Sequence, residues 1–195
     1  MVANSLHLAR SQGRSVLKVV LAVVLAIEEV FVVLVAGMTA IDGPSAFGWR
    51  VAAIAFVPLA IVAGILGIAV VALWQSGWGR DELLGPVRRG GVVAAASAHV
   101  AFGLYNIARG WLWPFSGVPD VSGSSDKATV LFVIAALIVV AFPPARWPAP
   151  KATLAFACAA ALAFPVVDLA TQAVAHRIWD EVSQHWPAFT SPVRR

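Results

Sequence analysis

The chain has 195 residues, of which 60% are hydrophobic and only 12% are charged. A water-soluble domain carries roughly 25% charged residues, so the charged side chains of this chain are too few to cover a water-facing surface. The length leaves no room for a soluble domain beside a membrane bundle. The net charge of +4 comes from basic residues between apolar runs, which favours contact with lipid head groups over nucleic-acid binding.

Five apolar runs predict transmembrane helices, because a helix needs about 20 residues to cross a hydrocarbon core of ~30 Å. The first run follows a basic segment, as in a signal peptide, but its length and its two glutamates indicate a retained helix. The fourth run is the shortest, and we expect either a thin span or a re-entrant segment there. The runs cover residues 16–38, 51–74, 92–113, 128–142 and 152–171.

The segment after the fifth run predicts a helix at the membrane surface. In residues 172–189, apolar side chains that include two tryptophans recur at three- and four-residue spacings. Such a stripe on a polar helix is typical of a helix in the lipid interface or docked on a partner subunit. The sequence therefore predicts an all-α, polytopic transmembrane bundle of four to five helices over residues 1–190, ending in an amphipathic helix, with a tail at 191–195.

Basic residues between the runs predict the orientation of this bundle. With the N-terminus in the cytoplasm, the cytoplasmic segments carry eight Lys and Arg residues and the outer segments carry five. Because basic residues favour the cytoplasmic side, we expect the N-terminus inside and the C-terminus outside. Arg outnumbers Lys, and Ala and Val dominate, which is typical of a GC-rich bacterial genome and suggests a bacterial inner (plasma) membrane.

Polar side chains within the predicted spans are the first candidates for a functional site, since each ionisable group there costs roughly 3 kcal/mol. Counted from the cytoplasmic end of each helix at ~1.5 Å per residue, Glu28 and Glu29 lie near 18–20 Å, His99 near 10 Å and Asn106 near 21 Å. Adjacent glutamates point about 100° apart on a helix. We predict an intramembrane polar cluster of these four residues, which fits either a proton relay or a structural hydrogen-bond cluster.

Two further pairs of residues carry predictions. Arg109 and Asp168 have opposite charges at matching depths on the third and fifth runs, which predicts an ion pair that acts as a clamp between helices or as a switchable gate. Arg88 and Arg89 stand before the third run beside two glycines, where a helix N-terminus favours an anion. A lipid phosphate is a candidate ligand there, and ordinary cytoplasmic anchoring is the alternative.

Patterns for a metal, a cofactor or an enzyme are missing from the sequence. Its one cysteine, Cys158, cannot form an internal disulfide or a multi-cysteine metal site. The depths of His99 and His176 do not match those of two axial ligands of one haem. The chain has no Gly-x-Ser-x-Gly, His-Glu-x-x-His or Gly-x-x-x-x-Gly-Lys motif. We therefore expect no cofactor, no metal and no catalytic residue.

Three functions are compatible with these observations. The leading hypothesis is a non-catalytic accessory subunit that packs against a larger membrane complex, such as a transporter or a respiratory assembly, with membrane lipids and other membrane subunits as partners and no nucleic acid. One alternative is a small proton- or ion-coupled transporter or channel that works through Glu28, Glu29 and His99. Another is a lipid-handling membrane enzyme that holds its substrate through Arg88 and Arg89.

Overall fold

The computed structural model describes residues 2–47, 49–112, 124–155 and 157–159. All regular structure in this part of the chain is helical and none of it is β-strand, which confirms the all-α prediction. The long helices are α1 (Val2–Phe47), α2 (Trp49–Gly77), α3 (Pro86–Leu112) and α4 (Ser124–Ala141), with short 3-10 helices η1 (Asp81–Leu83) and η3 (Pro144–Arg146). Residues 150–155 and 157–159 are also helical. The rest of the predicted fifth span and the predicted surface helix at 172–189 lie outside the described residues.

Three of the described helices are long and apolar enough to cross a membrane, which is consistent with a membrane protein. The candidate spans are Gln12–Ile41 in α1, Phe56–Gly77 in α2 and Pro86–Ala108 in α3. Helix α4 has 18 residues, or about 27 Å at 1.5 Å per residue, so it is slightly shorter than a hydrocarbon core of ~30 Å.

The helix boundaries differ from the predicted runs where polar residues join a helix. Helix α1 begins at Val2, well before the predicted residue 16, because residues 2–15 contain no proline and continue the same helix. Helix α3 begins at Pro86, six residues before the predicted start, because proline fits the first turn of a helix, where its missing N–H has no partner to lose.

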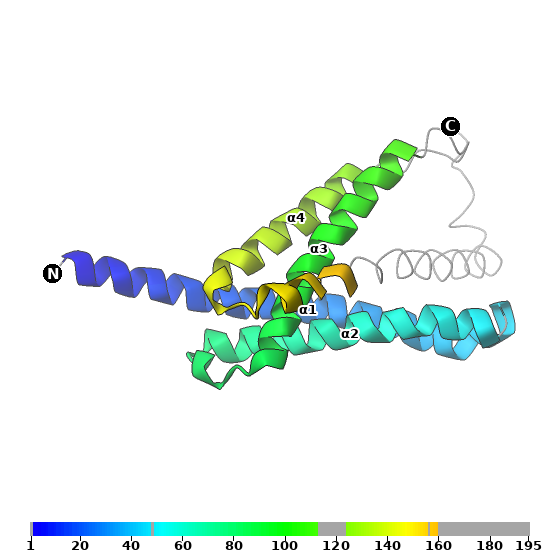
Figure 1. The fold of residues 1–195 in the computed structure, drawn as a ribbon, viewed down its shortest axis with the longest axis horizontal. Helices are drawn as coiled ribbons and strands as arrows, with labels where there is room; N and C mark the ends of the chain where they lie inside the picture. The colour runs from blue at the N-terminus through cyan, green and yellow to red at the C-terminus, as the bar shows by residue number, and fades with distance from the viewer. Residues whose placement is uncertain (1, 48, 113–123, 156, 160–195) are drawn as a thin grey trace, which may run out of the picture.

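The helices form two pairs that pack against each other (Figure 1). Helices α1 and α2 lie side by side as an antiparallel hairpin, and α3 and α4 form a second pair that is inclined to the first. Contacts of α2 with α3 and of α1 with α4 join the pairs. Apolar side chains from all four helices form one buried cluster, which includes Leu21, Leu25, Leu59, Leu73, Val92 and Ile138, together with Phe142 directly after α4.

Small residues on α3 let the helices approach closely. Ala94 and Ala95 are fully buried. A Cβ atom on Gly91 would lie 2.3 Å from Cγ2 of Ile68 on α2, and a Cβ atom on Gly103 would lie 2.8 Å from the Phe132 ring on α4. Because real carbon atoms do not approach so closely, glycine at these two positions sets the spacing of α3 from both neighbours.

Candidate functional site

Glu28 of α1 and His99 of α3 form a hydrogen-bonded pair between the two halves of the bundle. The Glu28 Oε2 atom lies 3.0 Å from His99 Nε2, and the His99 side chain is almost completely buried whereas that of Glu28 is 31% exposed. On the other side of the ring, His99 Nδ1 lies 2.7 Å from the carbonyl oxygen of Ala95, one turn earlier in α3. A carbonyl can only accept, so Nδ1 carries a proton and donates it.

The other two members of the predicted polar cluster point elsewhere. Asn106 Nδ2 donates to the carbonyl oxygen of Phe102, within its own helix, at 2.9 Å. The Glu29 carboxylate faces α2, where a Cβ atom on Gly67 would lie 2.6 Å from its Oε1 atom. Among the described residues, no hydrogen bond or ion pair joins this carboxylate to a partner. The structure thus brings Glu28 and His99 together and separates both Glu29 and Asn106 from them.

The Glu29 carboxylate lines an open groove with a volume of about 560 Å³. We call it the Glu29 groove; its walls are Glu29, Ala63, Gly64, Gly67, Ile68, Val71, Val87 and Arg88. Most of these residues are apolar, and three of them are Gly or Ala. Arg88, one of the two arginines predicted to contact an anion, donates from Nη1 to the Gln75 side-chain oxygen. The groove therefore combines an apolar floor, a carboxylate without an intrachain partner in the described part, and a guanidinium that is already hydrogen-bonded.

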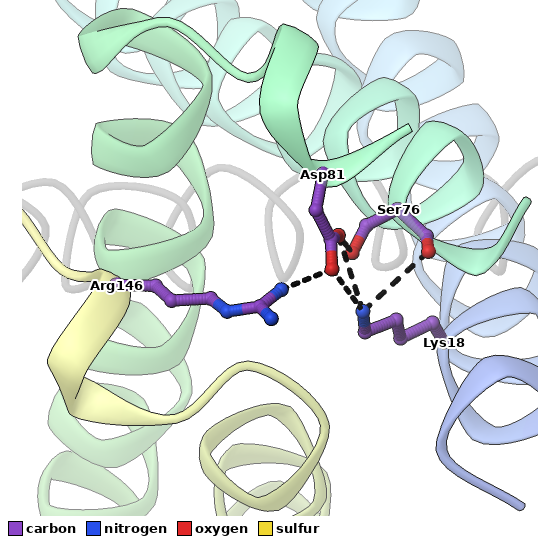
Figure 2. A network of polar contacts seen from close by, with 4 residues as sticks. All are labelled: Lys18, Ser76, Asp81 and Arg146. Carbon is purple, nitrogen blue, oxygen red and sulfur yellow. Dashed lines mark hydrogen bonds and ion pairs between the residues drawn. The ribbon is translucent and has the colours of Figure 1, made fainter. Parts of the chain in front are cut away.

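A second polar cluster, which we call the Asp81 network, joins segments that are far apart in the sequence (Figure 2). Lys18 Nζ of α1 lies 3.2 Å from Oδ1 and 3.3 Å from Oδ2 of Asp81 in η1. Ser76, near the end of α2, donates its hydroxyl to Oδ1, and Arg146 of η3 donates from Nη1 to Oδ2. Lys18 also donates to the Ser76 carbonyl oxygen at 3.5 Å. One carboxylate therefore holds together α1, the end of α2 and the segment after α4.

The charges of the Asp81 network are unevenly exposed. Lys18 is 6% exposed, whereas the side chain of Arg146 is 45% exposed. Partial burial raises the pKa of Asp81, but the hydrogen bonds from Ser76 and Arg146 and the positive charge of Lys18 outweigh it and leave this pKa below its usual value. Asp81 is therefore ionised at neutral pH and neutralises the buried Lys18 ammonium group.

Sequence reasoning did not single out this network. Lys18 and Arg146 are two of the eight basic residues in the predicted cytoplasmic segments, and no role was predicted for Asp81. The available signal was the position of Lys18 inside a span, since an ammonium group there needs a counter-charge. The predicted ion pair of Arg109 and Asp168 lies outside the described residues, because Asp168 and the side chain of Arg109 are both beyond them. Arg89 donates its backbone N–H to the Gly85 carbonyl oxygen at 3.2 Å, within the first turn of α3.

In the described part of the chain, no three or more His, Cys, Asp and Glu side chains gather in a way that could hold a metal ion. What the described residues offer is a hydrogen-bonded carboxylate–histidine pair, a groove with a carboxylate and a charged network that joins the helix ends. No protein-family model matches the chain, and no curated protein or solved structure shows significant similarity to it.

Proposed function

We propose that this chain is a non-catalytic accessory subunit of a larger assembly in a bacterial inner membrane, with its N-terminus in the cytoplasm. The observation that supports this function is the Glu29 carboxylate, which lines an open and mainly apolar groove inside the candidate span Gln12–Ile41. A carboxylate at this position is costly unless a donor or a cation reaches it. The described part of the chain supplies neither.

The lining of the groove indicates what kind of partner fits. Gly64, Gly67 and Ala63 let a second backbone come close, as small residues do at helix–helix interfaces in membranes. Arg88 already donates to Gln75, and its positive charge disfavours a second cation beside it. We therefore propose a transmembrane helix of another subunit, with a hydrogen-bond donor or a lysine placed level with Glu29 and away from Arg88.

Co-purification in mild detergent from the native membrane tests this function. The variants are Glu29→Ala, which removes the carboxylate, and Gly67→Ala, whose methyl group would lie 2.6 Å from Glu29 Oε1 and force that flexible side chain to move. The control is Gly37→Ala, since a Cβ atom there meets nothing within 4 Å and the residue is outside the groove.

We expect another membrane protein to co-purify with the wild type and with Gly37→Ala. Its yield should fall at least about tenfold (~1.4 kcal/mol) with both groove variants. A clean monomer contradicts the proposal, as does a partner whose yield is the same in all four proteins. Capture of a second copy of this chain, or of lipid alone, also contradicts it.

The pair of Glu28 and His99 favours a second candidate function, a small proton- or ion-coupled transporter. Carboxylate–histidine pairs within a membrane are typical elements of proton pathways. This function requires flux in reconstituted proteoliposomes that depends on Glu28 or Glu29. If Glu28→Gln and Glu29→Gln both leave the flux unchanged, transport through these residues is excluded.

A further inference from the structure

We infer that Glu28 and His99 form a binding site for one proton, and that this proton holds α1 to α3. The inference concerns a proton-binding site and does not depend on a partner in the Glu29 groove or on transport across the membrane. It rests on the two contacts of the His99 ring, one to Ala95 in its own helix and one to Glu28 in α1.

The contact to Ala95 fixes the tautomer of the ring. Because Nδ1 must donate to the Ala95 carbonyl oxygen, Nε2 of a neutral His99 has only a lone pair to offer. A carboxylate oxygen also has only lone pairs, so a separation of 3.0 Å is a hydrogen bond only if one proton lies between the two atoms. That proton belongs either to Glu28, as a carboxylic acid that donates to Nε2, or to His99, as an imidazolium that donates to the carboxylate.

Both arrangements contain the same single proton and have the same net charge of zero. Removing it leaves two lone pairs facing each other, or forces the ring proton from Nδ1 to Nε2 at the cost of the Ala95 contact. Adding a second proton leaves a net positive charge beside a nearly fully buried ring, which is unfavourable within a membrane. Only the state with one shared proton satisfies both contacts of the ring without leaving a net charge on the pair.

Within the part of the chain that the structure describes, few other titratable groups lie near this pair. On α1 the neighbouring group is Glu29, whose carboxylate points to Gly67 of α2. Helix α2 has no ionisable residue after Arg50, and residues 128–141 of α4 have none. On α3, Arg88 and Arg89 lie about three turns before His99, and Asn106 is neutral and bonded to Phe102. Among the described residues, the position of the shared proton therefore depends on Glu28 and His99 themselves, and Glu29 is the adjacent ionisable residue in the sequence.

Nitrogen-15 NMR of histidine-labelled full-length protein in lipid nanodiscs tests the inference between about pH 5 and about pH 10, a range that brackets ordinary histidine titration. Subtraction of the spectrum of His99→Gln assigns the His99 signals. Glu28→Gln is the informative variant, because a glutamine amide donates to Nε2 as the carboxylic acid does but cannot release its proton. Glu29→Gln is the matched control, one residue along the same helix.

In the wild type we expect a protonated Nδ1 at neutral pH and one change in the Nε2 signal with rising pH, as the shared proton leaves. Glu28→Gln should keep a protonated Nδ1 and an unprotonated Nε2 over the whole range, and Glu29→Gln should show the wild-type transition. An unprotonated Nδ1 at neutral pH overturns the inference. So does a transition that persists in Glu28→Gln, and so does a wild type without any transition.

Discussion

Substitution of Asp81 by Asn removes the one negative charge of the Asp81 network while keeping the shape of the side chain. Lys18, which is 6% exposed, then has only neutral acceptors in reach, the amide oxygen of the new Asn side chain and the Ser76 carbonyl oxygen at 3.5 Å. Loss of one partner of a fully buried ion pair costs about 3–5 kcal/mol. Because Asp81 is partly exposed, we expect the free energy of unfolding to fall by about 2–4 kcal/mol.

The remaining members of the network should follow a definite order. Arg146→Ala should cost under about 1 kcal/mol, since the arginine side chain is nearly half exposed and water replaces its contact. The double variant Lys18→Met/Asp81→Asn should be more stable than Asp81→Asn alone, because it removes the ammonium group that the single variant leaves without a counter-charge.

Unfolding of the purified protein by sodium dodecyl sulfate in mixed micelles, followed by circular dichroism, measures these differences. We expect a coupling energy between Lys18 and Asp81 of at least about 1 kcal/mol. If Arg146→Ala costs as much as Asp81→Asn, or if the effects of Lys18→Met and Asp81→Asn simply add, the buried ammonium group does not dominate the network and the reasoning is refuted.

Three further predictions concern pH, packing and the two glutamates. The difference in the free energy of unfolding between the wild type and Asp81→Asn should be constant above about pH 4, the ordinary pKa of an aspartate. It should shrink as the pH falls through the lower pKa of folded Asp81, because a depressed carboxyl pKa stabilises only the ionised folded protein. Unfolding measured against pH checks this, and a difference that grows on acidification contradicts it. Gly91→Ala should destabilise the protein by about 1–3 kcal/mol, since its Cβ would lie 2.3 Å from Ile68 Cγ2 and 3.4 Å from the Ala69 backbone nitrogen. The control Gly37→Ala should not destabilise it, and equal unfolding free energies for the two variants would count against the close packing of α3 on α2. Glu28→Ala should cost about 1–3 kcal/mol because it leaves His99 Nε2 buried without a partner, and Glu29→Ala should leave the isolated protein within about 1 kcal/mol of the wild type; a larger loss for Glu29→Ala would show that its carboxylate has an intrachain partner.

The helical nature of the chain followed from hydrophobic runs because a membrane span must satisfy its backbone hydrogen bonds internally. Boundaries were less predictable, since apolarity does not report where a helix continues into polar residues. Helix α1 extends back to Val2, and only proline at position 86 signalled the early start of α3.

Membrane depths estimated from residue counts placed Glu28 and His99 at different levels because every helix was taken to stand upright in the membrane. The inclination of the α3–α4 pair against α1 and α2 (Figure 1) is compatible with contact between two side chains at unequal distances along their own helices. The Asp81 network was beyond sequence reasoning for another reason: the two charged partners, Lys18 and Arg146, are 63 and 65 residues from Asp81 in the chain. Only the packing of the helices brings such distant segments together.

Photo-cross-linking from inside the Glu29 groove tests the proposed function most directly. A photoreactive amino acid at Val71, a partly exposed wall residue of the groove, is compared in native membranes with one at Val133 of α4, which is similarly exposed but outside the groove. We expect Val71, and not Val133, to cross-link to a transmembrane segment of another protein that carries a hydrogen-bond donor or a lysine, and we expect Glu29→Ala to abolish the product. Cross-links from Val71 only to lipid, to a second copy or to residues 160–195 of the same chain would contradict the account.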